Sequence, residues 1–308
     1  MIGKIILVMF AIVLMFVALF VSYQNLPAEP VSLIYDNPQD NFNPIIKYSA
    51  TPVFADNMRF NHNDISFSIG SSCSKARRNS MIEAFVLFQE KMPIISFYEV
   101  GGTADIYIEC SDEEVELSGD YFAAGEGGPS RVINTSNFKI IEEGKVLLYR
   151  DTQCTFPLVE LHELFHVFGF DHSVNPRSIM YNVSSCDQRI TQDIIDLVNE
   201  LYSVEPLPDA VVGEISAVKK GKYLDFNITV LNEGLIGLGN MELFVVVEGE
   251  EIQSFSLGKI DVGFGRVIKA ENIKLPSRNV EVIDFIIDVK NTVRELNKEN
   301  NAVRMMVE

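Results

Sequence analysis

Three of the four histidines in this 308-residue chain fall within one stretch, residues 161–172, which reads L-H-E-L-F-H-V-F-G-F-D-H. His162 and His166 are four residues apart, so on a helix of about 3.6 residues per turn they share one face and can reach one metal ion. Gly169 can take the left-handed conformation that ends a helix, and the following turn can bring His172 to the same ion. The spacing therefore predicts a metal centre held by three imidazoles.

This donor set fits zinc in a catalytic setting. Three protein ligands with a fourth position left to water are typical of catalytic zinc, whereas structural zinc is usually closed by four ligands. Glu163 lies beside the ligands but off their coordination axis, where a carboxylate can serve as a general base. An H-E-x-x-H match also occurs by chance on amphipathic helices, but chance does not explain three of four histidines at this spacing. We predict one catalytic Zn2+ bound by His162, His166 and His172, with Glu163 as the catalytic residue.

The same residues resemble a known family of peptidases. H-E-x-x-H-x-x-G-x-x-H followed by a Met-turn is the metzincin signature, and S-I-M-Y at 178–181 follows His172 closely enough to be that turn. The runs G-F-D-H-S at 169–173 and A-D-I-Y-I at 104–108 are most similar to the matrixins. The resemblance covers residues 61–202 and implies an α+β zincin fold with a mixed five-stranded sheet and three helices. By resemblance Met180 forms an apolar floor under the ligands, while plain core packing is its alternative role.

The resemblance also implies where a substrate would lie. Arg131, Val132, Ile133 and Asn134 would belong to an antiparallel edge strand that lines the cleft and binds substrate as an added strand. An ordinary surface hairpin is the alternative interpretation of this run. Tyr181 would begin the wall of the pocket for the residue after the cleaved bond. These five residues are the candidate cleft residues.

The four cysteines predict two disulfides in an exported protein. Cys73, Cys110, Cys154 and Cys186 contain no C-x-x-C pair, so neither a ribbon-type zinc site nor a thioredoxin motif is indicated. A Cys154–Cys186 bridge would brace the zinc helix, which follows Cys154, against the loop after the Met-turn. Cys73–Cys110 is then the complementary pair.

Net charge limits the classes of partner. A formal net charge of −18 argues against electrostatic binding of nucleic acid or of an anionic lipid surface. The acidic loop at 112–116 has charges that would suit Ca2+, but we interpret it as a solvated charge run and do not predict calcium. Protein or peptide substrates remain the expected partners.

The N-terminus reads as a membrane segment. Residues 5–21 form an uninterrupted apolar run after Lys4, with no charged residue before Glu29. This run exceeds the usual apolar region of a signal peptide, about 7–15 residues, and reaches the lower limit of about 17 for a spanning helix. We expect residues 1–22 to be an uncleaved single-pass anchor, with the N-terminus cytoplasmic and the catalytic domain outside. A cleaved signal peptide, which would give a secreted protein, is the alternative.

The remaining chain divides into three segments. Residues 23–57 contain five prolines with Asn and Asp between them, which indicates a linker or stalk, with a short inhibitory prosegment as the alternative. Residues 58–204 hold the matrixin-like domain. Residues 205–308 show regularly spaced short β-rich runs, which predict an all-β immunoglobulin-like sandwich. Its ending, V-R-E-L-N-K-E-N-N at 293–301, resembles the cell-adhesion-related (CARDB-like) domain of prokaryotic surface proteins, which implies a spacer or a surface or cell-wall partner.

Together these features predict a membrane-anchored, extracytoplasmic zinc-dependent endopeptidase of matrixin-like type. Zinc held by three neutral imidazoles would lower the pKa of its bound water, and Glu163 would take the water's proton and pass it to the leaving amine. One alternative is a surface adhesion or binding protein whose metzincin domain is a catalytically silent scaffold. The presence of Glu163 beside three ligands argues against that alternative, since a silent domain has no chemical need for the carboxylate. A second alternative is a processing factor that cleaves only its own linker.

Overall fold

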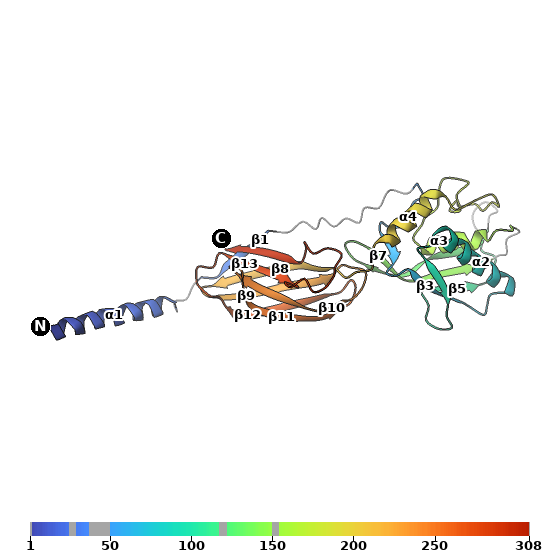
Figure 1. Cartoon of the computed structure of the whole chain (residues 1–308). Coiled ribbons are helices and arrows are strands. Elements are labelled where there is room, and N and C mark those ends of the chain that lie inside the picture. The colour runs from blue at the N-terminus through green and yellow to red at the C-terminus, as the bar shows by residue number, and fades with distance from the viewer. Residues whose placement is uncertain (1, 25–28, 37–49, 117–121, 150–153, 308) are drawn as a thin grey trace.

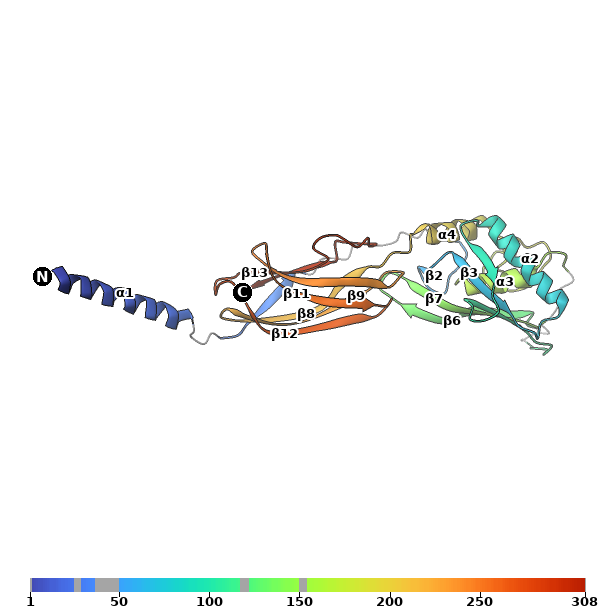
Figure 2. The same ribbon diagram turned by 60° about the horizontal axis from the view of Figure 1, so that its bottom comes forward.

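The computed structural model describes residues 2–24, 29–36, 50–116, 122–149 and 154–307. The molecule is elongated, with helix α1 at one end, an all-β domain in the middle and a mixed α/β domain at the other end (Figures 1 and 2). The helices are α1 (Ile2–Gln24), α2 (Lys75–Lys91), α3 (Leu158–Val167) and α4 (Gln192–Ser203). The strands of the α/β domain are β2 (Met58–Phe60), β3 (Asp64–Ile69), β4 (Ser96–Glu99), β5 (Ile106–Cys110), β6 (Gly125–Asn134) and β7 (Lys139–Leu148). The strands of the all-β domain are β1 (Val31–Asp36), β8 (Ala210–Lys220), β9 (Tyr223–Asn232), β10 (Leu238–Val247), β11 (Glu250–Ile260), β12 (Gly265–Lys274), β13 (Val282–Ile287) and β14 (Ala302–Val307).

The α/β domain is built on a mixed sheet in the order β2-β7-β5-β3-β4, with β6 added on β7. The pairs along this order are parallel, whereas β6 is antiparallel to β7. The sheet has six strands rather than the expected five. The additional strand, β2, is three residues long, which is too short for the period-two pattern that reveals strands in a sequence. Within the described residues β6 pairs with β7 alone, so it forms an edge of this sheet.

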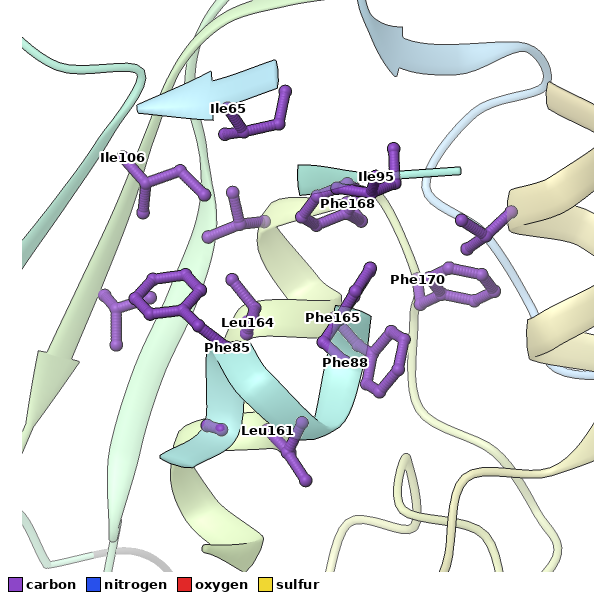
Figure 3. Packing of buried hydrophobic residues seen from close by; sticks show 14 of the residues in the cluster. Ile65, Phe85, Phe88, Ile95, Ile106, Leu161, Leu164, Phe165, Phe168 and Phe170 are labelled. Atoms are coloured by element: carbon purple, nitrogen blue, oxygen red, sulfur yellow. The ribbon is translucent and has the colours of Figure 1, made fainter. Parts of the chain in front are cut away.

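Helices α2 and α3 pack together through aromatic side chains (Figure 3). Ser74 caps α2 by accepting a hydrogen bond from the backbone N–H of Arg77 at 3.2 Å. The ring of Phe88 in α2 lies 4.9 Å from that of Phe165 and 4.7 Å from that of Phe168, centroid to centroid. Such pairs stabilise a core beyond the burial of their area. They fix the position of α3, the helix that carries the first two histidines of the cluster.

The all-β domain contains a strand from the region expected to be a linker. Its strand order is β11-β10-β13-β14-β1-β8-β9-β12, and β1 pairs antiparallel with β14 and β8. The linker expectation for residues 23–57 is therefore wrong for 31–36, while 25–28 and 37–49 lie outside the described residues. The sequence signal for β1 was weak, because this strand is only six residues long and lies between Pro30 and Pro38. Its partner strands also come far later in the chain. The pairing of β1 with β8 and β14 was also not predicted from the sequence.

The two domains meet at the tip of the β6–β7 hairpin. Phe138 and Ile140 from the α/β domain share a buried cluster with Leu235 and Val262 from the all-β domain. The side chain of Asn137 donates a hydrogen bond to the carboxylate of Asp209 at 3.3 Å. A shared apolar cluster with a buried polar contact favours a defined arrangement of the two domains.

Helix α1 exposes its apolar side chains over residues 9–23. Its last turn contacts the all-β domain, where the guanidinium of Arg278 lies over the ring of Tyr23 and donates to its carbonyl oxygen. Among the described residues, no helix combines the length and the hydropathy that a membrane crossing requires.

Candidate active site

Helix α3 places His162 and His166 on one face while burying the rest of its surface. Pro157 precedes the helix, and the residues that follow Leu158 are nearly all buried. Leu161, Leu164 and Phe165 lie in the core of the α/β domain (Figure 3). An apolar helix of this kind cannot rotate to expose its histidines without exposing its core face. The burial of α3 therefore fixes the direction in which the two imidazoles point.

A left-handed glycine ends α3 and reverses the chain. Gly169 has a φ of 92°, and its N–H donates to the carbonyl of His166 at 3.0 Å. A Cβ at this position would lie 2.8 Å from the sulfur of Met58, so a side chain is excluded by packing as well as by conformation. The turn leads the chain back to the helix and brings His172 beside the other two histidines, as the spacing predicted.

The three imidazoles converge on one point through their Nε2 atoms. These atoms lie 3.0 Å apart for His162 and His166, and 3.3 Å apart for the two pairs that include His172. The Nδ1 of His162 donates to the carbonyl of Ile179, and the Nδ1 of His166 donates to that of Phe170, each at 2.7 Å. Because the Nδ1 atoms carry the protons, two unprotonated Nε2 atoms face each other and the third histidine.

This geometry fits a bound metal ion. Two nitrogens on one tetrahedral zinc lie about 3.3–3.4 Å apart, given zinc–nitrogen bonds of about 2.0–2.1 Å. Converging lone pairs repel each other unless a cation lies between them. Burial and the neighbouring His166 lower the pKa of His162 to about 4, and burial lowers the pKa of His166. Both shifts keep the imidazoles neutral, which is the form that binds metals.

The loop after the histidines supports His162. Met180 is fully buried, which agrees with both roles considered for it, an apolar floor and core packing. The preceding residue, Ile179, supplies the carbonyl that holds His162. The N–H of Ser173 donates to the carbonyl of Met180 at 2.8 Å, which ties this turn to the segment that carries His172. The backbone of the turn thus orients His162, in the way that the outer hydrogen-bond partners of metal-binding histidines commonly do.

Glu163 is buried against the edge strand β6. Its side chain is 6% exposed. A Cβ on Gly125 would lie 2.8 Å from the Cγ of Glu163, and a Cβ on Gly127 would lie 2.1 Å from its carbonyl oxygen. Only glycines allow the strand to come this close to the helix. Burial, followed by the charges of Glu126 and Glu160, raises the pKa of Glu163 to about 8.

The candidate cleft residues separate into two groups. Tyr181 belongs to the turn beside the histidines, where its N–H donates to the carbonyl of Ser178 at 3.1 Å. Residues 131–134 lie at the other end of β6, next to the all-β domain. Arg131 pairs there with Glu142 at 2.9 Å, and Ile133 packs against the buried cluster between the domains. The part of β6 that lies beside Glu163 is residues 125–127, which precede the expected cleft residues in the strand. The sequence feature that marks this part is the glycine run G-E-G-G.

A segment from the expected linker also lies against the histidines. The ring of Phe54 stacks on His166 at 5.7 Å between centroids, with 14° between the planes. Its N–H donates to the carbonyl of Gly169 at 2.8 Å, and the N–H of Asp171 donates to the carbonyl of Pro52 at 2.8 Å. This contact was not predicted from the sequence, because a single aromatic residue in a proline-containing stretch gives no helix or strand periodicity. Phe54 covers one ring face of a predicted ligand.

Both expected disulfides are present. Cys154–Cys186 joins the chain just before α3 to the loop after Met180, with 5.4 Å between Cα atoms. Cys73–Cys110 joins the start of α2 to the end of β5, with 4.8 Å between Cα atoms. The first bridge therefore braces the segments on either side of the histidine cluster.

Two protein-family models match separate parts of the chain. A matrixin family model (Peptidase_M10) matches residues 59–203, and a CARDB family model matches residues 207–305. Stromelysin-2 of Rattus norvegicus is 39% identical over 66 residues, which are 20% of this chain and 14% of that protein. The matched part of the chain thus spans well under a fifth of the length of that relative.

Two of the solved structures similar to the chain each match about a third of it. A CARDB domain of Pyrococcus furiosus, solved in complex with di-metal ions, is 24% identical and covers 33% of this chain and 88% of that one, with a TM-score of 0.28. A domain of a putative cell surface protein of Methanosarcina acetivorans is 14% identical and covers 33% and 91%, also with a TM-score of 0.28. The family matches establish that the chain carries a matrixin domain at residues 59–203 followed by a CARDB domain at residues 207–305.

Proposed function

We propose that the matrixin domain is a zinc-dependent endopeptidase that hydrolyses peptide bonds, with His162, His166 and His172 as zinc ligands. The observation that carries this proposal is the convergence of the three Nε2 atoms within 3.3 Å of one another, with two Nδ1 atoms held by backbone carbonyls. A cluster of neutral imidazoles beside a buried carboxylate has the composition of a catalytic rather than a structural zinc site.

In this proposal Glu163 moves the proton. When bound, zinc would supply a Lewis acid that activates water and polarises the scissile carbonyl. Glu163, in its ionised form, takes a proton from the attacking water and then gives it to the leaving amine. Burial raises the pKa of Glu163 to about 8, and the positive charge of a bound zinc ion would lower it again, which favours the ionised carboxylate that takes the proton.

We place the substrate along the edge of β6 at residues 125–129. The backbone groups on this edge are free to pair with an extended peptide, because β6 pairs with no strand except β7 in the described part of the chain. Strand addition supplies affinity through main-chain hydrogen bonds and leaves selectivity to side-chain pockets. The glycines at 125 and 127 bring this edge against Glu163, so an added strand would pass the proton-transfer group.

We also propose that α1 anchors the protein in a membrane, with the two domains outside the cell. The apolar run at residues 5–21 supports this, as do the exposed apolar side chains of α1 at 9–23, which contact no core in the described residues. Extraction of membranes at alkaline pH tests it: an anchored chain stays in the pellet, whereas a secreted chain appears in the supernatant. For the CARDB domain we propose a spacer or surface-binding role, because it contains no cluster of metal ligands among its described residues.

Metal analysis combined with a peptide-library cleavage assay tests the enzymatic proposal. The wild-type chain is expected to bind one zinc and cut peptides, while Glu163→Ala should retain the zinc and lose cleavage. His62→Ala is the matched control, because His62 pairs with Asp105 at 3.2 Å and lies outside the histidine cluster. A chain that binds zinc but cuts nothing would favour the silent scaffold, and a chain that binds no zinc would overturn the proposal.

A further inference from the structure

Strand β1 belongs to the CARDB domain in space but precedes the matrixin domain in sequence. Residues 33–36 pair with 304–307 of β14, and Val31 and Ser32 pair with Lys219 and Val218 of β8. Between the two lies the whole matrixin domain, residues 59–203. The chain therefore leaves the CARDB domain after its first strand and returns to it only at β8 (Figure 1).

Strand β1 joins the two halves of the CARDB sheet. On one side it continues into β14-β13-β10-β11, and on the other into β8-β9-β12. Without β1, the backbone groups of β8 and β14 along this seam would lose their partners. Unpaired strand edges readily accept another strand, so these two strands form a receptor for an extended segment.

The side chains of β1 follow the alternation of a strand with one buried face. Leu33 is 8% exposed and shares the core of the sandwich with Ala217 and Met305, whereas Ile34 is 50% exposed. Tyr23, in the last turn of α1, adds the contact with Arg278 described above. Main-chain pairing on two sides, one apolar anchor and this flanking contact together hold the N-terminal segment.

We infer that the CARDB domain is a receptor for the chain's own residues 31–36, so that a cut between β1 and the matrixin domain leaves both domains bound to the N-terminal helix. The covalent connection from β1 to the matrixin domain runs through residues 37–49. Cutting it removes none of the pairing that holds β1 to β8 and β14. The N-terminus of the matrixin domain could then be freed while the protein stays attached to α1.

A chain with a cleavage sequence for a specific protease in place of part of 37–49, and an affinity tag at the C-terminus, tests this inference. After cleavage in mild detergent, the C-terminal fragment is captured through its tag and washed, and the N-terminal fragment is measured over time. The expected result is that the N-terminal fragment stays bound in buffer and leaves in denaturant. Immediate loss of the fragment in buffer would overturn the inference. The readout does not depend on peptidase activity.

Leu33→Ala and Ile34→Ala form a matched pair of variants one residue apart. Truncating the buried Leu33 should speed the loss of the fragment by at least about 30-fold, whereas truncating the exposed Ile34 should change it by less than about threefold. If a detergent micelle around α1, and not the pairing of β1, held the N-terminal fragment, both variants would retain the fragment equally. Equal behaviour of the two variants would therefore contradict the inference.

A peptide competition avoids variants that fold poorly. An excess of a synthetic peptide with the sequence of residues 29–36 is added to the cleaved wild-type complex. It should displace the N-terminal fragment, while the same peptide with Leu33 replaced by Asp should not. Retention of the fragment against the wild-type peptide over days would show that something other than the β1 seam holds it.

Discussion

Two buried carboxylates, one in each domain, have opposite environments. Burial, followed by Glu126 and Glu160, raises the pKa of Glu163 in the matrixin domain to about 8. Burial would also raise the pKa of Asp288 in the CARDB domain, but hydrogen bonds from Thr292, Val293 and Lys298 outweigh it and lower the pKa to about 2. A carboxylate surrounded by donors keeps its charge and holds structure, whereas one without them can exchange a proton.

Histidines in the same domain show a similar contrast. The Nε2 of His62 faces the carboxylate of Asp105 at 3.2 Å, so it has a partner within the protein. In the part of the chain that the structure describes, the Nε2 atoms of the three clustered histidines face only one another. Groups that the fold satisfies internally are structural, and groups that it leaves facing one another are available to an ion or a substrate. Four experiments test this distinction.

Metal removal should give the largest effect, and it should be confined to the matrixin domain. Chelation is expected to abolish peptide cleavage and to lower the stability of this domain by about 4 kcal/mol, if free zinc had been a thousandfold above its Kd. Calorimetry of the full chain, with one transition for each domain, measures the difference. His166→Ala should reproduce the effect of the chelator, and His62→Ala should not. Equal shifts in both transitions would contradict the distinction.

The two disulfides close loops of similar length but should differ in their effect on activity. Their sequence separations are 32 and 37 residues, so replacing either pair by serine should cost about 4 kcal/mol in the chain-entropy account. The Cys154–Cys186 bridge flanks the histidine cluster, so its loss should also lower kcat/KM and zinc affinity. Loss of Cys73–Cys110 should leave both unchanged at temperatures where the chain is folded. Titration with a chromophoric zinc chelator separates the two cases.

Local sequence spacing predicted the centre of the site better than its surroundings. His162, His166 and Gly169 belong to one helix and its end, where 3.6-residue periodicity and one glycine determine the geometry. The third ligand follows within three residues of that glycine. The Cys154–Cys186 bridge was also predictable, because its cysteines flank the same short region, and Cys73–Cys110 followed as the complementary pair.

Contacts between distant segments were not predictable in this way. Phe54 reaches His166, and β1 reaches β14, across more than a hundred residues, with no periodic pattern that marks either partner. The cleft strand was assigned to 131–134 by resemblance, while the close approach to the helix lies at its glycines 125 and 127. A glycine indicates that a side chain is excluded, but the sequence does not say which neighbour excludes it.

Adjacent glycines in β6 provide a smaller and more local test. A Cβ on Gly127 would overlap the carbonyl of Glu163, whereas a Cβ on Gly128 would have no atom within 4 Å. Gly127→Ala is expected to cost roughly 1–3 kcal/mol through overpacking and to lower kcat/KM by about 10-fold or more as Glu163 shifts. Gly128→Ala should change stability by no more than about 1 kcal/mol. Urea unfolding and a cleavage assay compare the two; equal effects would mean that β6 does not press on α3.

Replacing Asp288 should give the smallest effect. The pKa of its carboxyl is lowered, whereas that of Glu163 is raised, so the two groups make stability depend on pH in opposite directions. Its carboxylate accepts from the N–H and hydroxyl of Thr292 at 2.9 and 2.6 Å, from the N–H of Val293 at 2.9 Å and from Lys298 at 3.2 Å. The folded pKa of about 2 lies below the unfolded value of about 3.9. The stabilisation is therefore complete above about pH 4 and is lost as the pH falls toward 2.

The expected contribution of Asp288 is roughly 1–2 kcal/mol once screening by solvent is allowed for. Asp288→Asn should lower the free energy of unfolding of the CARDB domain by this amount at pH 7. It should also flatten the dependence of stability on pH between about 4 and 2. Glu271→Gln is the control, because its pair with Lys269 is exposed on both sides and should contribute less than about 1 kcal/mol. A CARDB transition that keeps its full acid dependence in Asp288→Asn would show that other carboxylates carry it, and that the donors around Asp288 do not set it apart from Glu163.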